Sequence, residues 1–124
     1  MKKIKKVLTI PQFPNAEIQL LLAWGDAELR IQRRPFEDRE PDWVSSGCAY
    51  QFKDKDGYNI FAISLHVKRL AEGGFLLNTA THESSHLTTY IMDTYDIKDD
   101  EFRSYTVGWL TQELYNLATA KGKK

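Results

Sequence analysis

The chain contains a single cysteine and four prolines, and its 124 residues carry no excess charge of either sign. The lone Cys48 cannot form an internal disulfide, and with no second cysteine near it we expect a small packed side chain rather than a metal ligand. Lysine plus arginine and aspartate plus glutamate both number 17, so no overall field attracts the protein to nucleic acid or to an anionic membrane. These shortages exclude a disulfide scaffold and argue against both of those partners.

Long apolar runs are also missing, since nothing approaches the roughly 18 apolar residues of a membrane-spanning helix. The basic residues 1–6 resemble the head of a secretion signal, but the apolar run at residues 7–10 stops at Pro11 and is too short for export. We therefore expect a cytoplasmic protein. Basic clusters at residues 2–6 and 30–34 could suggest nucleic-acid binding, but they come without net positive charge or a recognised motif.

What the sequence does contain is enough apolar material for one core, with 42% hydrophobic and 27% charged residues. We expect one domain over residues 1–124. Runs at residues 7–10 and 17–24 have the length of strands, although the second could also be helical. Asp26 can cap a short helix that continues to residue 34, and residues 37–42 are typical of a surface loop.

The sequence also predicts a hairpin. Apolar stretches at residues 48–53 and 58–67 flank an Asp-Lys-Asp-Gly turn, and its Asp56-Gly57 pair supplies the positive φ angles of a tight turn. Helical periodicity follows after residue 76. The predicted fold is therefore α+β: a small antiparallel sheet with a hairpin, then a helix over residues 76–95 and a C-terminal helix packed on it.

The helix at residues 76–95 carries the chemistry. A stripe of apolar residues should face the core, and it consists of Leu77, Ala80, Leu87 and Ile91. A neighbouring face is polar and carries His82, His86, Thr89 and Asp93. Histidines at i and i+4 lie about 5 to 6 Å apart at Cβ, so both imidazoles can hold one ion. Glu83 follows the first histidine, completing the pattern H-E-x-x-H, in which zinc lowers the pKa of water to about 7 and the glutamate removes its proton. The alternative is a pair of half-buried histidines satisfied by hydroxyls such as those of Thr79 or Ser85.

A catalytic zinc usually has three protein ligands, and Glu101 is the best third candidate. It opens a second helix that Asp99 or Asp100 can cap, and it shares a face with Tyr105, Gly108 and Gln112; the apolar stripe is Phe102, Thr106, Trp109, Leu110, Leu114 and Leu117. If the loop at residues 96–98 reverses the chain, this face can meet the metal. The alternative is that Glu101 only complements the helix dipole, and Asp93, Asp96 and His66 are competing ligands.

The string His82-Glu83-Ser84-Ser85-His86, followed by Glu101-Phe102-Arg103-Ser104-Tyr105, resembles the zinc metallopeptidases called gluzincins. The likeness is closest to small ImmA/IrrE-type domains and to short H-E-x-x-H proteins of tailed bacteriophages. In those families a hairpin precedes the motif helix, and the next helix begins with the glutamate ligand in a pattern such as E-A-x-A-Y. Here Phe102 and Ser104 replace the alanines, and the likeness covers residues 47–115.

The resemblance implies that His82, His86 and Glu101 bind zinc, that Glu83 is the general base and that Tyr105 stabilises an oxyanion. The implied reaction is peptide hydrolysis, in the host cytoplasm for a phage-encoded chain, with an extended substrate paired to the hairpin edge at residues 58–66. A second hypothesis is a regulatory or counter-defence binding protein with a structural or vestigial zinc site. Its interface could use Trp24, Trp43 or Trp109, whose other role is core packing.

Overall fold

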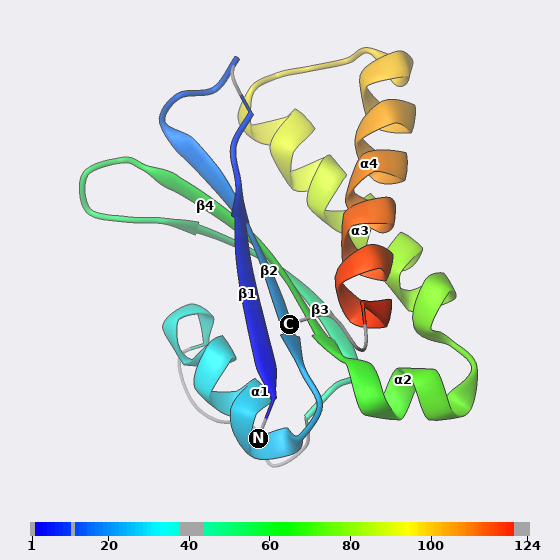
Figure 1. Ribbon diagram of the computed structural model, residues 1–124. Helices are drawn as coiled ribbons and strands as arrows, with labels where there is room; N and C mark the ends of the chain where they lie inside the picture. Colours follow the sequence, from blue (N-terminus) through cyan, green and yellow to red (C-terminus); the bar gives the residue numbers. More distant parts are fainter. Residues whose placement is uncertain (1, 11, 38–43, 121–124) are drawn as a thin grey trace.

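The chain folds into a four-stranded sheet with helices on both of its faces, as the computed structural model shows for residues 2–10, 12–37 and 44–120 (Figure 1). The strands are β1 (Lys3–Leu8), β2 (Ala16–Ala23), β3 (Gly47–Lys53) and β4 (Asn59–His66). The helices are α1 (Asp26–Arg33), the short 3-10 helix η1 (Arg34–Phe36), α2 (Val67–Gly73), α3 (Leu76–Thr94) and α4 (Asp100–Thr119). The α+β class is confirmed.

The sheet is mixed, which corrects the predicted antiparallel sheet. Its strand order is β1-β2-β4-β3, with antiparallel outer pairs and a parallel central pair, β2 and β4. The chain crosses from β2 through α1 to the far edge, forms β3 there, and returns as β4 between β3 and β2. Because both central strands have neighbours on each side and helices on each face, they are apolar almost throughout.

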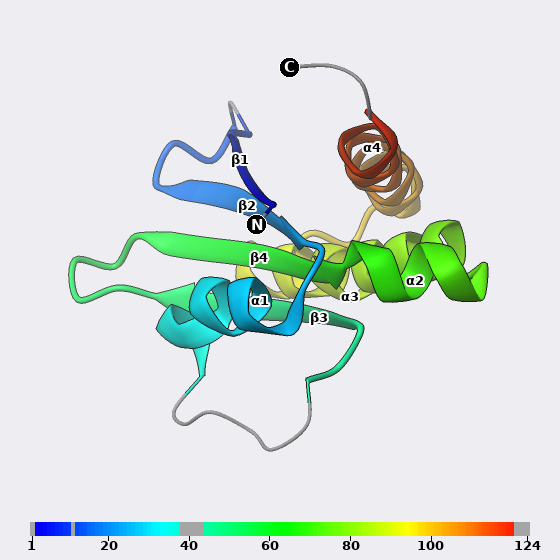
Figure 2. The same ribbon diagram turned by 60° about the horizontal axis from the view of Figure 1, so that its bottom comes forward.

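Two apolar layers hold the sheet to its helices (Figure 2). Helices α3 and α4 cover one face and α1 covers the other. Alternate residues of β2 and β4 face α3 and α4, namely Ile18, Leu20, Leu22, Phe61, Ile63 and Leu65, and they join the larger core cluster. On the α1 face a smaller cluster contains Ala23, Leu29 and Val44. None of the helices in the described ranges is both long and apolar enough to cross a bilayer.

The local predictions have a mixed outcome. The hairpin of β3 and β4 is confirmed, with Gly57 at φ 83° and the Asp54 N–H donating to the Tyr58 carbonyl at 3.0 Å. Asp99 is the N-cap of α4, and its side chain accepts from the Glu101 N–H. Helix α1 is confirmed, but Gly25 is its N-cap, and Asp26 is the first helical residue.

Three predictions of strand and core position are wrong. The first strand is Lys3–Leu8 rather than residues 7–10, because an exposed edge strand needs no apolar run. The strand predicted to reach Val67 stops at His66, where α2 begins. Leu77 is 54% exposed, since Leu76 takes its place in the core.

The two described tryptophans, for which core packing was one expectation, are only partly buried. Trp24 is half-buried against the larger core cluster, and Trp109 is 37% exposed on α4. Trp43, together with residues 38–42 of the predicted loop, lies outside the described residues.

Candidate metal centre

The two histidines of the motif lie side by side on the outer face of α3. Both are exposed, and their Nε2 atoms are 3.1 Å apart, with ring centroids separated by 4.6 Å and ring planes at 83°. Two imidazole nitrogens bound to one tetrahedral zinc at 2.0 to 2.1 Å would be about 3.3 Å apart. The pair is therefore close to the geometry of two ligands on one ion, although a hydrogen bond between neutral rings has a similar length.

Glu83 points away from the histidines, toward the sheet. One residue along a helix turns the side chain by about 100°, so Glu83 leaves the outer face and packs against β3. Its side chain is 8% exposed, and its Oε2 lies 3.3 Å from where a Cβ on Gly47 would be. Glycine at position 47 lets the strand approach α3 this closely.

The environment of Glu83 favours its protonated form. Desolvation by burial raises the pKa of the carboxyl group, while the charges of His82, His86 and Arg33 lower it. No hydrogen bond to this carboxylate comes from any residue that the structure describes. A carboxylate that is desolvated and has no donor holds a proton more readily, as a general base near neutral pH must.

A buried arginine, absent from the sequence predictions, supports this end of β3 from the opposite face. Arg33 donates from Nε to the Ser64 hydroxyl at 2.7 Å and from Nη1 to the Ser45 hydroxyl at 3.1 Å. The Ser45 hydroxyl in turn donates to the Gly47 carbonyl at 3.2 Å. Sequence alone gave little signal for Arg33, because an arginine in the last turn of an amphipathic helix is usually solvent-exposed.

The structure does not bring Glu101 to the histidines. Within residues 2–10, 12–37 and 44–120, no three histidine, cysteine, aspartate or glutamate side chains form a group that could hold a metal. Glu101 is exposed in the first turn of α4, and Tyr105 is 76% exposed one turn later. The start of α4 is tied to α3 by the Arg103 guanidinium, which donates to Thr89 at 3.1 Å, beyond His86 along α3. The ligand role of Glu101 stays a prediction.

His66, one of the competing ligands, has partners on both ring nitrogens. Its Nε2 lies 2.9 Å from Asp26 Oδ1, and its Nδ1 accepts the Arg69 backbone N–H at 3.3 Å. The ring belongs to the α1 side of the sheet, because α1 supplies Asp26. His66 therefore joins β4, α1 and α2 instead of completing the histidine pair.

The remaining competitors also stand apart from a three-ligand group. Asp93 is exposed on α3, and Asp96 pairs with Lys98 at 3.0 Å in the loop after it. Cys48 is half-buried on β3, with its Sγ 3.9 Å from the Ala49 carbonyl oxygen.

Comparison of the chain with protein-family models, with curated proteins and with solved structures yields no match. The likeness to gluzincins therefore depends on the two motifs, and the histidine pair is the feature of the fold most relevant to it.

Proposed function

We propose that the chain is a zinc-dependent hydrolase that cleaves peptides. The observation that supports this is the 3.1 Å separation of the His82 and His86 Nε2 atoms, which suits two ligands of one ion. Zinc bound there would polarise a carbonyl group and acidify water. By resemblance to the gluzincins Glu101 would be the third ligand and Tyr105 an oxyanion stabiliser, which requires the start of α4 to move toward the histidine pair.

Glu83 is the proposed general base. It follows His82 directly, and desolvation raises the pKa of its carboxyl group, so it accepts a proton more readily than an exposed glutamate does. It could take a proton from water and deliver it to the leaving amine. In the structure its carboxylate is turned toward Gly47, so this role requires the side chain to rotate back toward water at the histidine pair.

The proposed place for an extended substrate is β3. The predicted pairing site at residues 58–66 is wrong, because these residues form β4, which is hydrogen-bonded to β2 and β3 and has no free edge. Among the described residues strand β3 has a sheet neighbour on one side only, so a peptide could add to its other side through main-chain hydrogen bonds. A peptide bound there would run past the position of Glu83.

Metal content and hydrolysis test the proposal together. We expect about one zinc per chain, with affinity falling strongly in His82→Ala and His86→Ala but not in Asn78→Ala, an exposed change one turn earlier on α3. Glu83→Gln should keep the zinc and lose hydrolysis of a quenched-fluorescence peptide library by at least about 10²-fold. Absence of zinc binding by the metal-free parent on titration would refute the proposal.

A second candidate is a binding protein, of a regulatory or counter-defence kind, with a structural zinc site. The observation that favours it is that the described residues gather two metal donors rather than three, which leaves positions that a partner's side chain could complete. Glu83→Gln separates the two functions. A biological effect that survives Glu83→Gln but not His82→Ala would favour the binding protein.

A further inference from the structure

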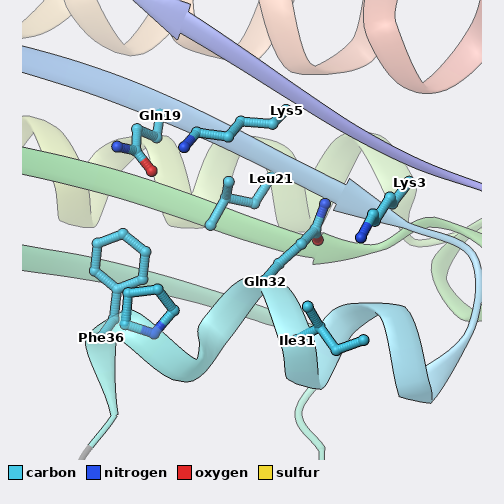
Figure 3. A pocket seen from close by; sticks show the side chains of 8 residues that line it. Lys3, Lys5, Gln19, Leu21, Ile31, Gln32 and Phe36 are labelled. Carbon is cyan, nitrogen blue, oxygen red and sulfur yellow. The ribbon is translucent and has the colours of Figure 1, made fainter.

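A second candidate site lies on the opposite face of the sheet from α3, where α1 and η1 meet β1 and β2 (Figure 3). It is a pocket of about 350 Å³, at the small end of the range for small-molecule sites. The lining residues are Lys3, Lys5, Gln19, Leu21, Ile31, Gln32, Pro35 and Phe36. No residue of the histidine pair or its surroundings takes part in it.

One side of the pocket is apolar. Leu21 of β2 is buried beneath it, while Ile31 of α1 is 44% exposed beside it. The Phe36 ring and Pro35 close the end formed by η1, as Figure 3 shows for the phenylalanine. An apolar ligand could cover Ile31 and the Phe36 ring without any rearrangement of the core, and removing such surface from water favours binding.

The other side carries two positive charges that no acidic side chain in the described part of the chain neutralises. Lys3 and Lys5 are alternate residues of β1, so both side chains lie on the α1 face of the sheet. Neither forms an ion pair with any described residue, whereas Lys6, between them and the end of the strand, pairs with Glu113 at 2.9 Å. In Figure 3 the Lys3 ammonium group lies toward Gln32 and that of Lys5 toward Gln19.

Two amide side chains are fixed at the same rim. Gln32 donates from Nε2 to the carbonyls of Ile4 and Leu22, at 3.1 Å each, and its Oε1 is buried with no hydrogen-bond partner among the described residues. Gln19 donates from Nε2 to Glu17 at 2.6 Å. Gln32 therefore uses both of its N–H donors and Gln19 uses one of its two, so Lys3 and Lys5 are the charged donors that remain for a ligand.

We propose that this pocket binds a small carboxylic acid with an apolar body. Its carboxylate would lie between Lys3 and Lys5, and its hydrocarbon part would cover Leu21, Ile31 and Phe36. Two separate ammonium groups suit one delocalised anionic group, and the apolar side excludes a ligand that is charged throughout. The site is independent of the zinc proposal, because it shares no residue with it.

The test uses 4-phenylbutyrate as the probe and 4-phenylbutyramide as its neutral counterpart. Amide chemical shifts of the full chain are followed by nuclear magnetic resonance during titration. With the acid we expect saturable shifts at Lys3, Lys5, Ile31 and Gln32. The affinity for the amide should be lower by about tenfold or more, because the amide cannot form the charge-assisted hydrogen bonds of the carboxylate.

Substitutions then separate charge from shape. The double change Lys3→Gln and Lys5→Gln should lower the affinity for the acid at least about tenfold and leave that for the amide nearly unchanged. Lys55→Gln, in the exposed hairpin turn, is the matched control with the same charge change. Ile31→Ser, on an exposed helix position, should weaken both probes. Equal binding of acid and amide, shifts that map elsewhere, or no saturation by millimolar acid would overturn the proposal.

Discussion

Gly47→Ala tests whether the close contact between β3 and α3 holds Glu83 in place. A Cβ at this position would lie 2.7 Å from Thr79 Cγ2, 3.2 Å from Glu83 Cγ and 3.3 Å from Glu83 Oε2. The first of these contacts is too short for two non-bonded carbon atoms, so the Thr79 side chain, α3 or the strand must shift. Alanine should therefore both destabilise the fold and displace the Glu83 side chain.

The magnitude follows from two opposing terms. Overpacking of this kind costs about 1 to 3 kcal/mol. Replacing glycine by alanine also restricts the unfolded chain, which returns roughly 0.4 to 1 kcal/mol where the backbone conformation suits alanine. Gly47 is not among the residues with positive φ, so this gain applies. The free energy of unfolding should fall by about 1.3 kcal/mol, which is the difference between the midpoints of the two ranges.

Urea unfolding of the metal-free protein, followed by circular dichroism, measures this difference. Gly108→Ala is the matched control, because a Cβ there meets nothing within 4 Å and alanine is the better helix former by about 1 kcal/mol. Adding Thr79→Ser to Gly47→Ala removes the closest methyl group and should recover part of the loss. If Gly47→Ala were as stable as the parent, the reasoning about this contact would be refuted.

Three further predictions concern the candidate metal centre. Burial raises the pKa of Glu83 in the folded state, so between the unfolded-state pKa and the folded-state pKa the folded protein binds more protons than the unfolded chain. The free energy of unfolding of the parent should therefore fall as pH rises through this range, and Glu83→Gln should lack the fall. Urea titrations of the metal-free proteins at about pH 4 to 7 measure this, and parallel curves for parent and variant would contradict it. Zinc at 100 times its dissociation constant should stabilise the parent by about 2.7 kcal/mol in thermal melts and leave His82→Ala unchanged, and an unresponsive parent would count against the site. Glu101→Ala should weaken zinc binding in calorimetry while Asp100→Ala, also in the first turn of α4, should not; equal effects would leave Glu101 only a dipole partner.

Features fixed by neighbouring residues were the ones that the sequence predicted well. The Asp56-Gly57 turn, the Asp99 cap and the side-by-side placement of His82 and His86 all depend on contacts within four residues. The mixed sheet depends on where the chain crosses after β2, and no periodicity records that crossing. Likewise, the composition of β1 is that of a charged segment, and it is the pairing with β2 that makes it a strand.

In the candidate site, too, features set by nearby residues were predicted and features set by distant contacts were not. The two histidines belong to one helix, so their spacing alone predicts that they meet. The place of Glu101 depends on how α4 is rotated and shifted against α3, and the apolar stripe of α4 fixes this only coarsely. Arg33 was missed for the same kind of reason, since the serines that accept its hydrogen bonds lie elsewhere in the chain.

The parallel pair at the centre of the sheet also bears on how the chain folds. The β1–β2 and β3–β4 pairs are each close in sequence and can form on a timescale of about 1 to 10 μs, but isolated two-stranded pairs are marginal in water. They unite only when Ala16 meets Asn59 and the strands align to Ala23 and His66. We expect the pairing of β2 with β4 to be the slow step of folding, so substitutions along these two strands should slow folding more than equally destabilising ones in the β3–β4 turn.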